Sequence, residues 1–384
     1  MPDHSTDEQF LRRALDLARQ GIGLASPNPY VGAVIADPQN NIVGTGVYTY
    51  DGVKHAEIRA LEHAGDKARG GTLYINLEPH SHQGRTPPCT DALIAAGIRR
   101  VVACMTDPNP EVSGRGFEEL RAAGVHVEVG RLEAEARRLN EAFARYIRHG
   151  IPLVTLKSAM TLDGKIAPSP ATDLTRAAGT PARGWITGES ARAHVQQQRH
   201  ESDAILVGVG TILADDPLLT DRSGNPRRRT LLRVILDSHL RLPLQSRLVQ
   251  SAANDVLVFC SAAEEKKKLE LEARGVRVEQ LSPAAEGRPD IHAILRRLGQ
   301  LEITSVMIEG GAAVNGTMLD SGAVDKLFLY YAPTILGAGS VPFASGASSS
   351  GLSAALRLKH PLLHRFGDDV AVEGYLRDPY ADAE

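Results

Sequence analysis

The chain has 384 residues, more than one compact hydrophobic core usually serves, so we expect two domains. Its net charge of −3 and its aromatic content of 4% argue against a nucleic-acid-binding module, which needs basic grooves and stacking platforms. No apolar run is long enough to span a bilayer, and three cysteines without a C-x-x-C pair suit a reducing compartment. We therefore expect a cytoplasmic globular protein that binds neither nucleic acid nor membrane.

The first 150 residues alternate short apolar runs with amphipathic patterns. A capping box that begins at Thr6 opens a helix that ends near Gly21. The next expected elements are a hairpin of strands over 31–36 and 42–47, a helix over 55–64, a strand over 72–77, a helix over 88–96, a strand over 101–105 and a helix over 133–148. Strands that alternate with helices in this way predict a three-layer α/β sandwich.

A domain boundary is expected at Gly150-Ile151-Pro152, after which the alternation starts again. Strands are expected over 153–157, 204–209, 233–236, 256–259 and 306–308, with a helix over 189–198 and a final strand over 327–331. Loops rich in small residues are expected over 168–183 and 337–351. The sequence thus predicts one α/β domain over residues 1–150 and a second over residues 151–384.

A histidine and a glutamate open the helix expected over 55–64, as His55-Ala56-Glu57. Pro79-His80 follows the next strand, and Pro88-Cys89 opens the next helix. Zinc deaminases carry an H-x-E…P-C-x-x-C pattern, in which His and Cys hold the metal and Glu moves protons. The metal lowers the pKa of a bound water, and the glutamate carries that water's proton to the ring and to the departing ammonia. These motifs favour a catalytic zinc site.

Each part of this pattern also has a plainer explanation. A His and a Glu at a helix start are ordinary surface residues, since a carboxylate there suits the helix dipole. Pro-Pro-Cys at a helix start is explained by capping together with a buried thiol. The order of the parts, which runs helix, strand, loop and second helix, is what favours the metal.

A second candidate site follows the strand expected over 306–308. In Ile308-Glu309-Gly310-Gly311-Ala312, two glycines stand where a strand gives way to a helix, so backbone N–H groups can approach a phosphate there. A plain turn that needs positive φ explains the same glycines. The dinucleotide fingerprint G-x-G-x-x-G is not met at Gly208-Val209-Gly210, because Leu213 stands in place of the third glycine.

Several stretches resemble one known family across nearly the whole chain. In the first half they are "PNPYVG" (27–32), "HAE" (55–57), "TLYINLEPHSHQGRTPPCTDALI" (72–94) and "DPNP" (107–110). In the second half they are "LKSAMTLDGKIA", "WITG", "DAILVGVGTILADDPLLTDR" and "IEGG". These motifs resemble the bifunctional deaminase/reductase family of riboflavin biosynthesis. The resemblance implies an N-terminal cytidine-deaminase-like three-layer α/β/α domain and a C-terminal dihydrofolate-reductase-like α/β domain.

His80 departs from that family, in which a cysteine ligand normally stands at this position. Imidazole is itself a good zinc ligand. The resemblance therefore still implies a metal set of His55, His80 and Cys89, with Glu57 as the catalytic proton carrier. His82 is a rival ligand, ranked second because the family has a histidine at that position beside its cysteine.

For the second half, the resemblance implies binding of NADPH and of a pyrimidine ribosyl phosphate. The implied cofactor-binding residues are Ala159, Trp185, Thr211, Asp215, Gly311, Ala312, Ala313, Val314, Asn315, Gly316 and Thr317. The implied substrate-binding residues are Asn28 in the first domain and Arg183, Arg199, Leu219, Arg222 and Glu309 in the second. The arginines would grip the ribose phosphate through charge-assisted hydrogen bonds. Without the resemblance, Trp185 would be assigned to core filling and Arg199 to a solvated helix face.

On this resemblance the chain is a multifunctional enzyme, both hydrolase and oxidoreductase. The zinc-dependent domain would hydrolytically deaminate a diaminopyrimidine ribosyl phosphate, and the NADPH-dependent domain would then reduce the ribosyl to a ribityl chain. We also expect a homo-oligomer. One alternative is a reductase with a weakened deaminase half, because His80 replaces the usual cysteine. A less favoured alternative is a non-catalytic RNA-binding module on a deaminase fold.

Overall fold

The computed structural model describes residues 4–82, 87–169, 184–284, 287–346 and 355–382. The chain divides into two compact units. Unit 1 comprises Met1–Gly150, Pro226–Arg229 and Asp382–Glu384, and unit 2 comprises Ile151–Asn225 and Thr230–Ala381. Within the described part of the chain, no helix combines the length and the apolar character that crossing a bilayer requires.

Unit 1 is built around a five-stranded sheet in the order β2-β1-β3-β4-β5. Strand β1 is antiparallel to both β2 and β3, whereas β3, β4 and β5 run parallel to one another. The strand bounds are β1 Gly32–Ala36, β2 Ile42–Val47, β3 Thr72–Ile75, β4 Arg100–Ala103 and β5 His126–Val129. β1 is buried along its whole length, as a central strand of near-continuous apolar residues should be.

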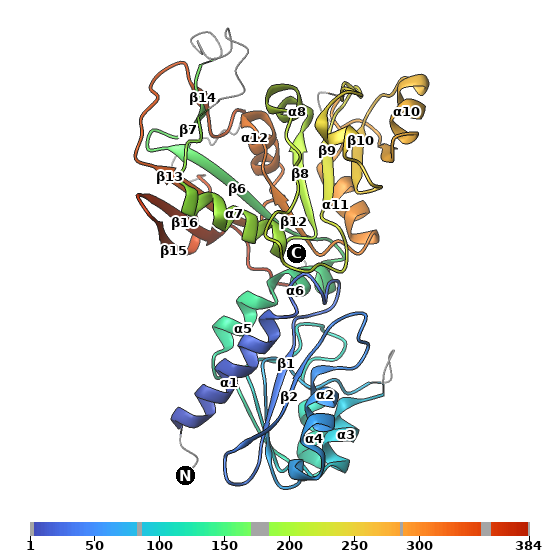
Figure 1. Ribbon diagram of the computed structural model, residues 1–384, viewed down its shortest axis with the longest axis vertical. Helices are drawn as coiled ribbons and strands as arrows, with labels where there is room; N and C mark the ends of the chain where they lie inside the picture. The colour runs from blue at the N-terminus through green and yellow to red at the C-terminus, as the bar shows by residue number, and fades with distance from the viewer. Residues whose placement is uncertain (1–3, 83–86, 170–183, 285–286, 347–354, 383–384) are drawn as a thin grey trace. The chain divides into compact units, whose positions relative to one another are not determined.

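Helices cover both faces of this sheet (Figure 1). On one face, α2, α3 and α4 pack on the sheet through a core that includes Ala60, Leu93 and Phe117. α1 contacts β1 and β3 and also α5. The helix bounds are α1 His4–Arg19, α2 Ala56–Ala64, the short 3-10 helix η1 Gly65–Ala68, α3 Cys89–Ala95, α4 Arg115–Ala122, α5 Glu133–Leu139 and α6 Glu141–His149. The three-layer sandwich predicted for this region is confirmed.

The single helix expected over 133–148 is wrong, because it is divided at Asn140. The backbone of Asn140 leaves the helical region (φ −107°, ψ 17°), and its side chain is 1% exposed. That side chain accepts a hydrogen bond from the N–H of Tyr30 (2.8 Å) and donates one to its carbonyl oxygen (3.1 Å). A buried asparagine that binds a distant backbone segment thus interrupts a helical pattern that is otherwise continuous.

Helix α4 and strand β5 were not predicted from the sequence. β5 is an edge strand whose sequence, HVEV, is half-buried at its centre and exposed at both ends. Such a strand lacks the apolar run or clean alternation on which strand prediction depends.

Unit 2 contains a nine-stranded sheet in the order β11-β10-β9-β8-β12-β6-β13-β16-β15. The first seven strands in this order are parallel, and β16 and β15 add an antiparallel edge. The strand bounds are β6 Leu153–Thr161, β8 Ala204–Gly208, β9 Leu232–Leu236, β10 Val256–Cys260, β11 Val276–Gln280, β12 Ser305–Ile308, β13 Lys326–Ala332, β15 Lys359–Phe366 and β16 Asp369–Tyr375. A separate pair is formed by β7 Lys165–Ala167 and β14 Val341–Pro342.

Two apolar clusters lie on the two faces of the parallel strands. One cluster joins the sheet to α11 and α12, for example through Leu295 and Met318, and the other joins it to α8, α9 and α10. α7 packs on β13 and β16 through Ala191 and Val195. The helix bounds are α7 Glu189–Glu201, α8 Val209–Asp215, α9 Arg247–Gln250, α10 Glu265–Glu272, α11 Ile291–Gln300 and α12 Ala312–Asp320.

The expectation that 327–331 is the final strand is wrong, because β15 and β16 follow it. β15 is an edge strand with the sequence KHPLLHRF, mostly exposed and interrupted by a proline, so it carries no strand pattern. The loop expected over 337–351 contains the short strand β14 in its described part. Most of the loop expected over 168–183 lies outside the described residues.

Candidate active sites

A glycine in β2 allows the start of α2 to pack directly on the sheet of unit 1. A Cβ atom on Gly46 would lie 2.0 Å from the carbonyl oxygen of Ala56, closer than any real contact allows. His55 is the N-cap of α2, with extended backbone, and Glu57 lies in the first turn of the helix, 3% exposed. The sequence therefore fixes the two residues of the H-x-E motif at a helix start that is pressed against β2.

The backbone of His80 joins the turn after β3 to the start of α3. Its carbonyl oxygen accepts hydrogen bonds from the N–H groups of Cys89 (2.7 Å) and Thr90 (3.2 Å), the first two residues of α3. These N–H groups have no partner within the helix itself, so the turn satisfies them. Two candidate ligands from separate segments are thereby held next to each other.

The structure brings the three predicted metal ligands together. One donor atom each from His55, His80 and Cys89 lies within 4.8 Å of the other two, and among the described residues this is the one such group of His, Cys, Asp or Glu. Nδ1 of His55 lies 3.2 Å from Sγ of Cys89, and the carboxylate of Glu57 hydrogen-bonds to the same thiol. His82 lies outside this group.

The electrostatic surroundings suit a metal ion. Burial, reinforced by the imidazoles of His55 and His82, lowers the pKa of His80 to about 4, so His80 is neutral near pH 7 and has a lone pair to offer. Burial, reinforced by Glu57, raises the pKa of the Cys89 thiol above its usual range. A metal ion would displace that proton and stabilise the thiolate. Two histidines and one cysteine are a donor set that zinc accepts.

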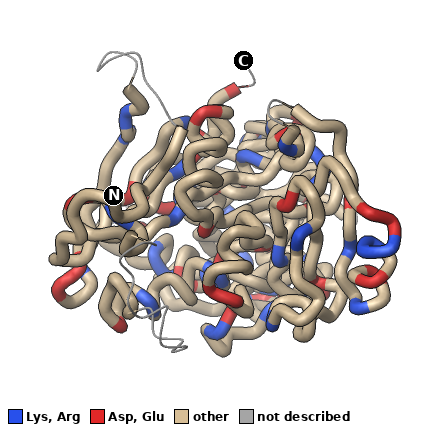
Figure 2. The backbone as a smooth tube through the Cα atoms, turned by 90° about the horizontal axis from the view of Figure 1, so that it is seen from above, with Lys and Arg blue, Asp and Glu red and all other residues tan. Residues whose placement is uncertain are grey.

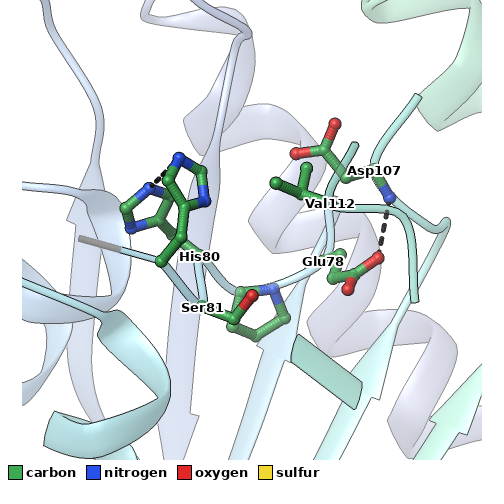
Figure 3. A pocket seen from close by; sticks show the side chains of 7 residues that line it. Glu78, His80, Ser81, Asp107 and Val112 are labelled. Carbon is green, nitrogen blue, oxygen red and sulfur yellow. Dashed lines mark hydrogen bonds between the residues drawn. The ribbon is translucent and has the colours of Figure 1, made fainter. Parts of the chain in front are cut away.

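The two ring nitrogens of His80 differ in their hydrogen-bond partners among the described residues. Nε2 of His80 lies 3.2 Å from Nε2 of His82, and the two rings are drawn with this bond in Figure 3. Nδ1 of His80 is buried and has no hydrogen-bond partner among the described residues. A buried polar atom without a partner destabilises the fold, so the position of this atom among three candidate ligands favours a metal site.

Sequence reasoning missed Glu78, which precedes the His80 turn. Its carboxylate accepts three backbone hydrogen bonds, from the N–H groups of Asp107 (3.0 Å), Gly114 (2.9 Å) and Gly116 (2.8 Å). Glu78, His80 and Asp107 line one pocket (Figure 3). Glu78 thus links the "DPNP" segment to the turn that carries His80. The sequence feature that could have predicted this role is a glutamate directly after an apolar strand.

The predicted substrate residue Asn28 is connected to the same centre. Its side-chain amide donates a hydrogen bond to the hydroxyl oxygen of Tyr48 (2.5 Å). The ring of Tyr48 packs edge-on against the imidazole of His55, with the ring centroids 5.6 Å apart. Asn28 therefore lies one aromatic residue away from a candidate ligand.

Unit 2 contains a cluster of three charged residues, Lys157, Arg199 and Glu309, whose side chains are only 10–14% exposed. Arg199 on α7 donates two hydrogen bonds to the carboxylate of Glu309, at 2.8 and 3.0 Å, and a third to the carbonyl oxygen of Thr220. Nζ of Lys157 on β6 lies 3.7 Å from the same carboxylate. Burial alone would raise the pKa of Glu309, but Lys157 and Arg199 outweigh it and lower the pKa to about 2. Lys157 was missed, although a lysine inside an apolar strand is itself a signal.

The predicted cofactor residues lie mainly at the ends of adjacent parallel strands. Thr211 and Asp215 lie on α8, which follows β8, and Gly311 is the N-cap of α12, which follows β12. A Cβ atom on Gly208 would lie 2.7 Å from Val314, so the first turn of α12 packs on the end of β8. Ligands in open α/β sheets bind at such carboxyl ends, where the strand order reverses. The other members of the predicted α12 segment are Ala312, Ala313, Asn315, Gly316 and Thr317.

The remaining predicted residues have varied surroundings. Trp185 is 74% exposed, so core filling is wrong for it, and the guanidinium of Arg192 lies 5.1 Å from its ring centroid. Arg199 is buried, so a solvated position is wrong for it as well. Leu219 is buried with φ +56°, and Arg222 is exposed. Ala159 is half-buried in β6, and Arg183 lies outside the described residues.

Two family models match the chain. The RibD C-terminal domain matches residues 152–372, and the cytidine and deoxycytidylate deaminase zinc-binding region matches residues 4–105. The chain belongs to the RibD family. The riboflavin biosynthesis protein RibD of Actinobacillus pleuropneumoniae is 40% identical over 97% of this chain and 96% of its own length. The Escherichia coli RibD is 38% identical over 95% of this chain and 98% of its own length.

Solved RibD structures agree with the fold. Acinetobacter baumannii RibD matches with a TM-score of 0.82 at 34% identity, over 97% of this chain and 99% of that one. A deaminase/reductase from Thermotoga maritima matches with a TM-score of 0.80 at 36% identity, over the same shares. The predicted combination of a cytidine-deaminase-like domain with a dihydrofolate-reductase-like domain is confirmed. As a RibD protein, the chain is a bifunctional deaminase and reductase of riboflavin biosynthesis.

Proposed function

We propose that residues 1–150 form a zinc-dependent hydrolytic deaminase and residues 151–384 an NADPH-dependent reductase. The two act in turn on one pyrimidine ribosyl phosphate. The Thermotoga maritima relative is described as a diaminohydroxyphosphoribosylaminopyrimidine deaminase and 5-amino-6-(5-phosphoribosylamino)uracil reductase, which supports this choice of substrates. The observation that carries the proposal is the convergence of His55, His80 and Cys89 beside Glu57.

In unit 1, His55, His80 and Cys89 would hold zinc, and Glu57 would move the protons. A bound zinc ion supplies acidification of water, so that a nucleophile is available near pH 7. Glu57, buried at the start of α2, would take one proton from the attacking water and deliver it to the ring nitrogen. It would then take the proton of the added hydroxyl and deliver it to the departing amine, which leaves as ammonia. Asn28 orients the pyrimidine, since its amide can both donate and accept hydrogen bonds.

In unit 2, the first turn of α12 would bind the cofactor phosphates through its backbone N–H groups. Gly311 at the N-cap has no atom within 4 Å of the position that a Cβ would occupy, so the approach to these groups is open. Trp185, Ala159, Thr211 and Asp215 would lie on the nicotinamide side. The cofactor supplies the hydride, and the protein would hold the cofactor and the substrate close together in the orientation that the transfer requires.

Arg199 needs a changed role in this proposal. Its guanidinium donates hydrogen bonds to Glu309 and Thr220, so it fixes the Glu309 carboxylate instead of gripping a phosphate directly. Arg222, exposed on the adjoining segment, would contact the ribose phosphate. Leu219 and Arg183 would complete the substrate contacts.

The direct test is incubation of the purified protein with the diamino substrate, with and without NADPH. Ammonia should be released in both cases, and the ribityl product should form only with NADPH. The variant Glu57→Gln should lose roughly 10²- to 10⁴-fold in ammonia release while still reducing substrate that is already deaminated. Full zinc occupancy without ammonia release would favour the alternative of a reductase with a weakened deaminase half. Gain of activity in His80→Cys would show that the histidine has a catalytic cost.

We further propose that the enzyme works in the cytoplasm as a homo-oligomer. All three cysteines are free, which supports a reducing compartment. Basic and acidic residues are interspersed along the chain in the view of Figure 2, as expected for an enzyme that binds small molecules. Light scattering after size-exclusion chromatography measures the oligomeric state directly.

A further inference from the structure

His80 is the residue by which this chain departs from the ligand set of its family, and its two ring nitrogens have different surroundings. Nε2 lies 3.2 Å from Nε2 of His82, and the ring centroids are 4.1 Å apart. Nδ1 is buried and without a hydrogen-bond partner among the described residues. One nitrogen is therefore engaged by a neighbouring side chain, and the other is available.

The covalent structure of the side chain also favours Nδ1 as the ligand atom. Nδ1 is two bonds from Cβ and Nε2 is three, whereas the cysteine sulfur that normally stands here is one bond from Cβ. Ligation through Nδ1 therefore places the donor atom nearest to the position of the sulfur it replaces. His55 likewise directs Nδ1 at the centre, 3.2 Å from Sγ of Cys89.

A neutral imidazole carries its single proton on one nitrogen and a lone pair on the other. If Nδ1 of His80 binds the metal, the proton must reside on Nε2, where Nε2 of His82 can accept it. Residues that accept the second N–H of a ligating histidine fix both its tautomer and its ring orientation. His82 itself is not one of the three mutually close donors, and its side chain is exposed.

We propose that His82 is a positioning residue for zinc, which accepts a hydrogen bond from Nε2–H of His80 and so presents Nδ1 of His80 to the metal. This inference rests on the proposed zinc dependence of unit 1. It assigns to His82 a role that exists only because residue 80 is a histidine. A cysteine ligand has no side-chain N–H that a neighbouring residue could accept.

The test is zinc affinity, measured by competition with a chromophoric chelator on the full-length protein. His82→Ala should weaken zinc binding by about 10- to 100-fold, the usual effect of removing such a partner. His82→Gln should bind nearly as well as the wild type, because the glutamine amide oxygen can accept the same hydrogen bond. In a His80→Cys background, His82→Ala should leave zinc affinity unchanged.

Cobalt substitution gives a second readout, since the visible spectrum of bound Co²⁺ reports the number of nitrogen and sulfur ligands. At saturation, the cobalt spectrum of His82→Ala should match that of the wild type, which shows that the ligands are the same. Saturation should require a higher cobalt concentration. Loss of a nitrogen ligand in both His82→Ala and His82→Gln would identify His82 as a ligand and overturn the inference. Equal weakening by His82→Ala in the wild-type and His80→Cys backgrounds would do so too.

The outcomes also separate this inference from the proposed function. A wild-type protein that binds no zinc and still releases ammonia would overturn the proposed zinc dependence, and the role of His82 with it. A wild-type protein that binds zinc tightly, with His82→Ala unchanged, would overturn the role of His82 alone. Circular dichroism of each variant checks that the exposed substitution leaves the fold intact.

Discussion

The polar centres of the two units differ in how completely the protein itself satisfies them. In unit 2, the carboxylate of Glu309 is held by two hydrogen bonds from Arg199 and by the nearby ammonium of Lys157. In unit 1, a buried nitrogen of His80 has no partner among the described residues, and burial beside Glu57 raises the pKa of the Cys89 thiol. The first centre is satisfied by its own side chains, whereas the second has a buried nitrogen with no partner in the described part of the chain.

The two centres should therefore be stabilised by different interactions, one by ion pairs within the protein and the other by a bound metal ion. A buried charged cluster depends on all its members, because removal of one leaves the others charged and unpaired. A metal centre depends on the free concentration of the ion, because binding to the folded state alone stabilises that state by mass action. The two units should therefore respond to different perturbations.

The largest effect is expected for Glu309→Gln. Arg199 and Lys157 would then lose the carboxylate that they share, and the free energy of unfolding of unit 2 should fall by about 3–5 kcal/mol. Calorimetry of the variant checks this, with Glu272→Gln on the exposed face of α10 as the matched control. Replacing all three charged residues together by apolar residues should recover much of the loss.

The same cluster predicts the acid response of unit 2. Because Glu309 has a folded-state pKa below its ordinary value of 4.5, its contribution to stability is complete above pH 4.5 and is lost as the pH falls toward 2. The melting temperature of unit 2 should fall over that range in the wild type and fall less steeply in Glu309→Gln. Identical slopes would contradict the assignment.

Removal of zinc should destabilise unit 1 and leave the stability of unit 2 unchanged. At a free zinc concentration about one thousand times the dissociation constant, binding stabilises the folded state by about 4 kcal/mol. Chelation should thus lower the melting temperature of unit 1, abolish ammonia release, and leave reduction by NADPH intact. Equal shifts of both transitions would show that the units do not differ in the way described.

A smaller effect tests the loop beside the metal centre. Burial, with a contribution from Glu78, raises the pKa of Asp107 from 3.8 to about 6. The charged form is therefore disfavoured in the folded state, so Asp107 lowers stability as the pH rises from about 4 to above 6. Asp107→Asn should stabilise unit 1 by about 3 kcal/mol at pH 8 and by nothing near pH 3, as measured by urea unfolding at both values.

The elements predicted accurately from the sequence are those whose ends are marked by turn residues or prolines and whose interiors are apolar runs. The hairpin of β1 and β2 and the helix starts at His55 and Cys89 lie within a residue or two of their predicted positions, because turn residues, prolines and apolar runs mark them. The convergence of His55, His80 and Cys89 was predicted as well, from the order of motifs and from the family resemblance.

The misses have a common cause, which is that they depend on partners far away in the sequence. Asn140 ends a helix because its side chain binds the backbone of Tyr30. Arg199 is buried because Glu309 lies opposite it, and the polar residues next to Arg199 in the sequence give no sign of this. The edge strands β5 and β15 owe their existence to the strands beside them, since neither has a strong pattern of its own.

The position of β12 in the sheet has a consequence for how the chain folds during synthesis. Val306 of β12 pairs with Val154 of β6 on one side and with Ala204 of β8 on the other, so the strand that joins these two is made long after both. Until β12 leaves the ribosome, β6 and β8 expose unpaired edges, which are templates for wrong pairing. Such long-range closure slows folding. We therefore expect that the nascent reductase half, in contrast to the half made first, depends on protection by chaperones.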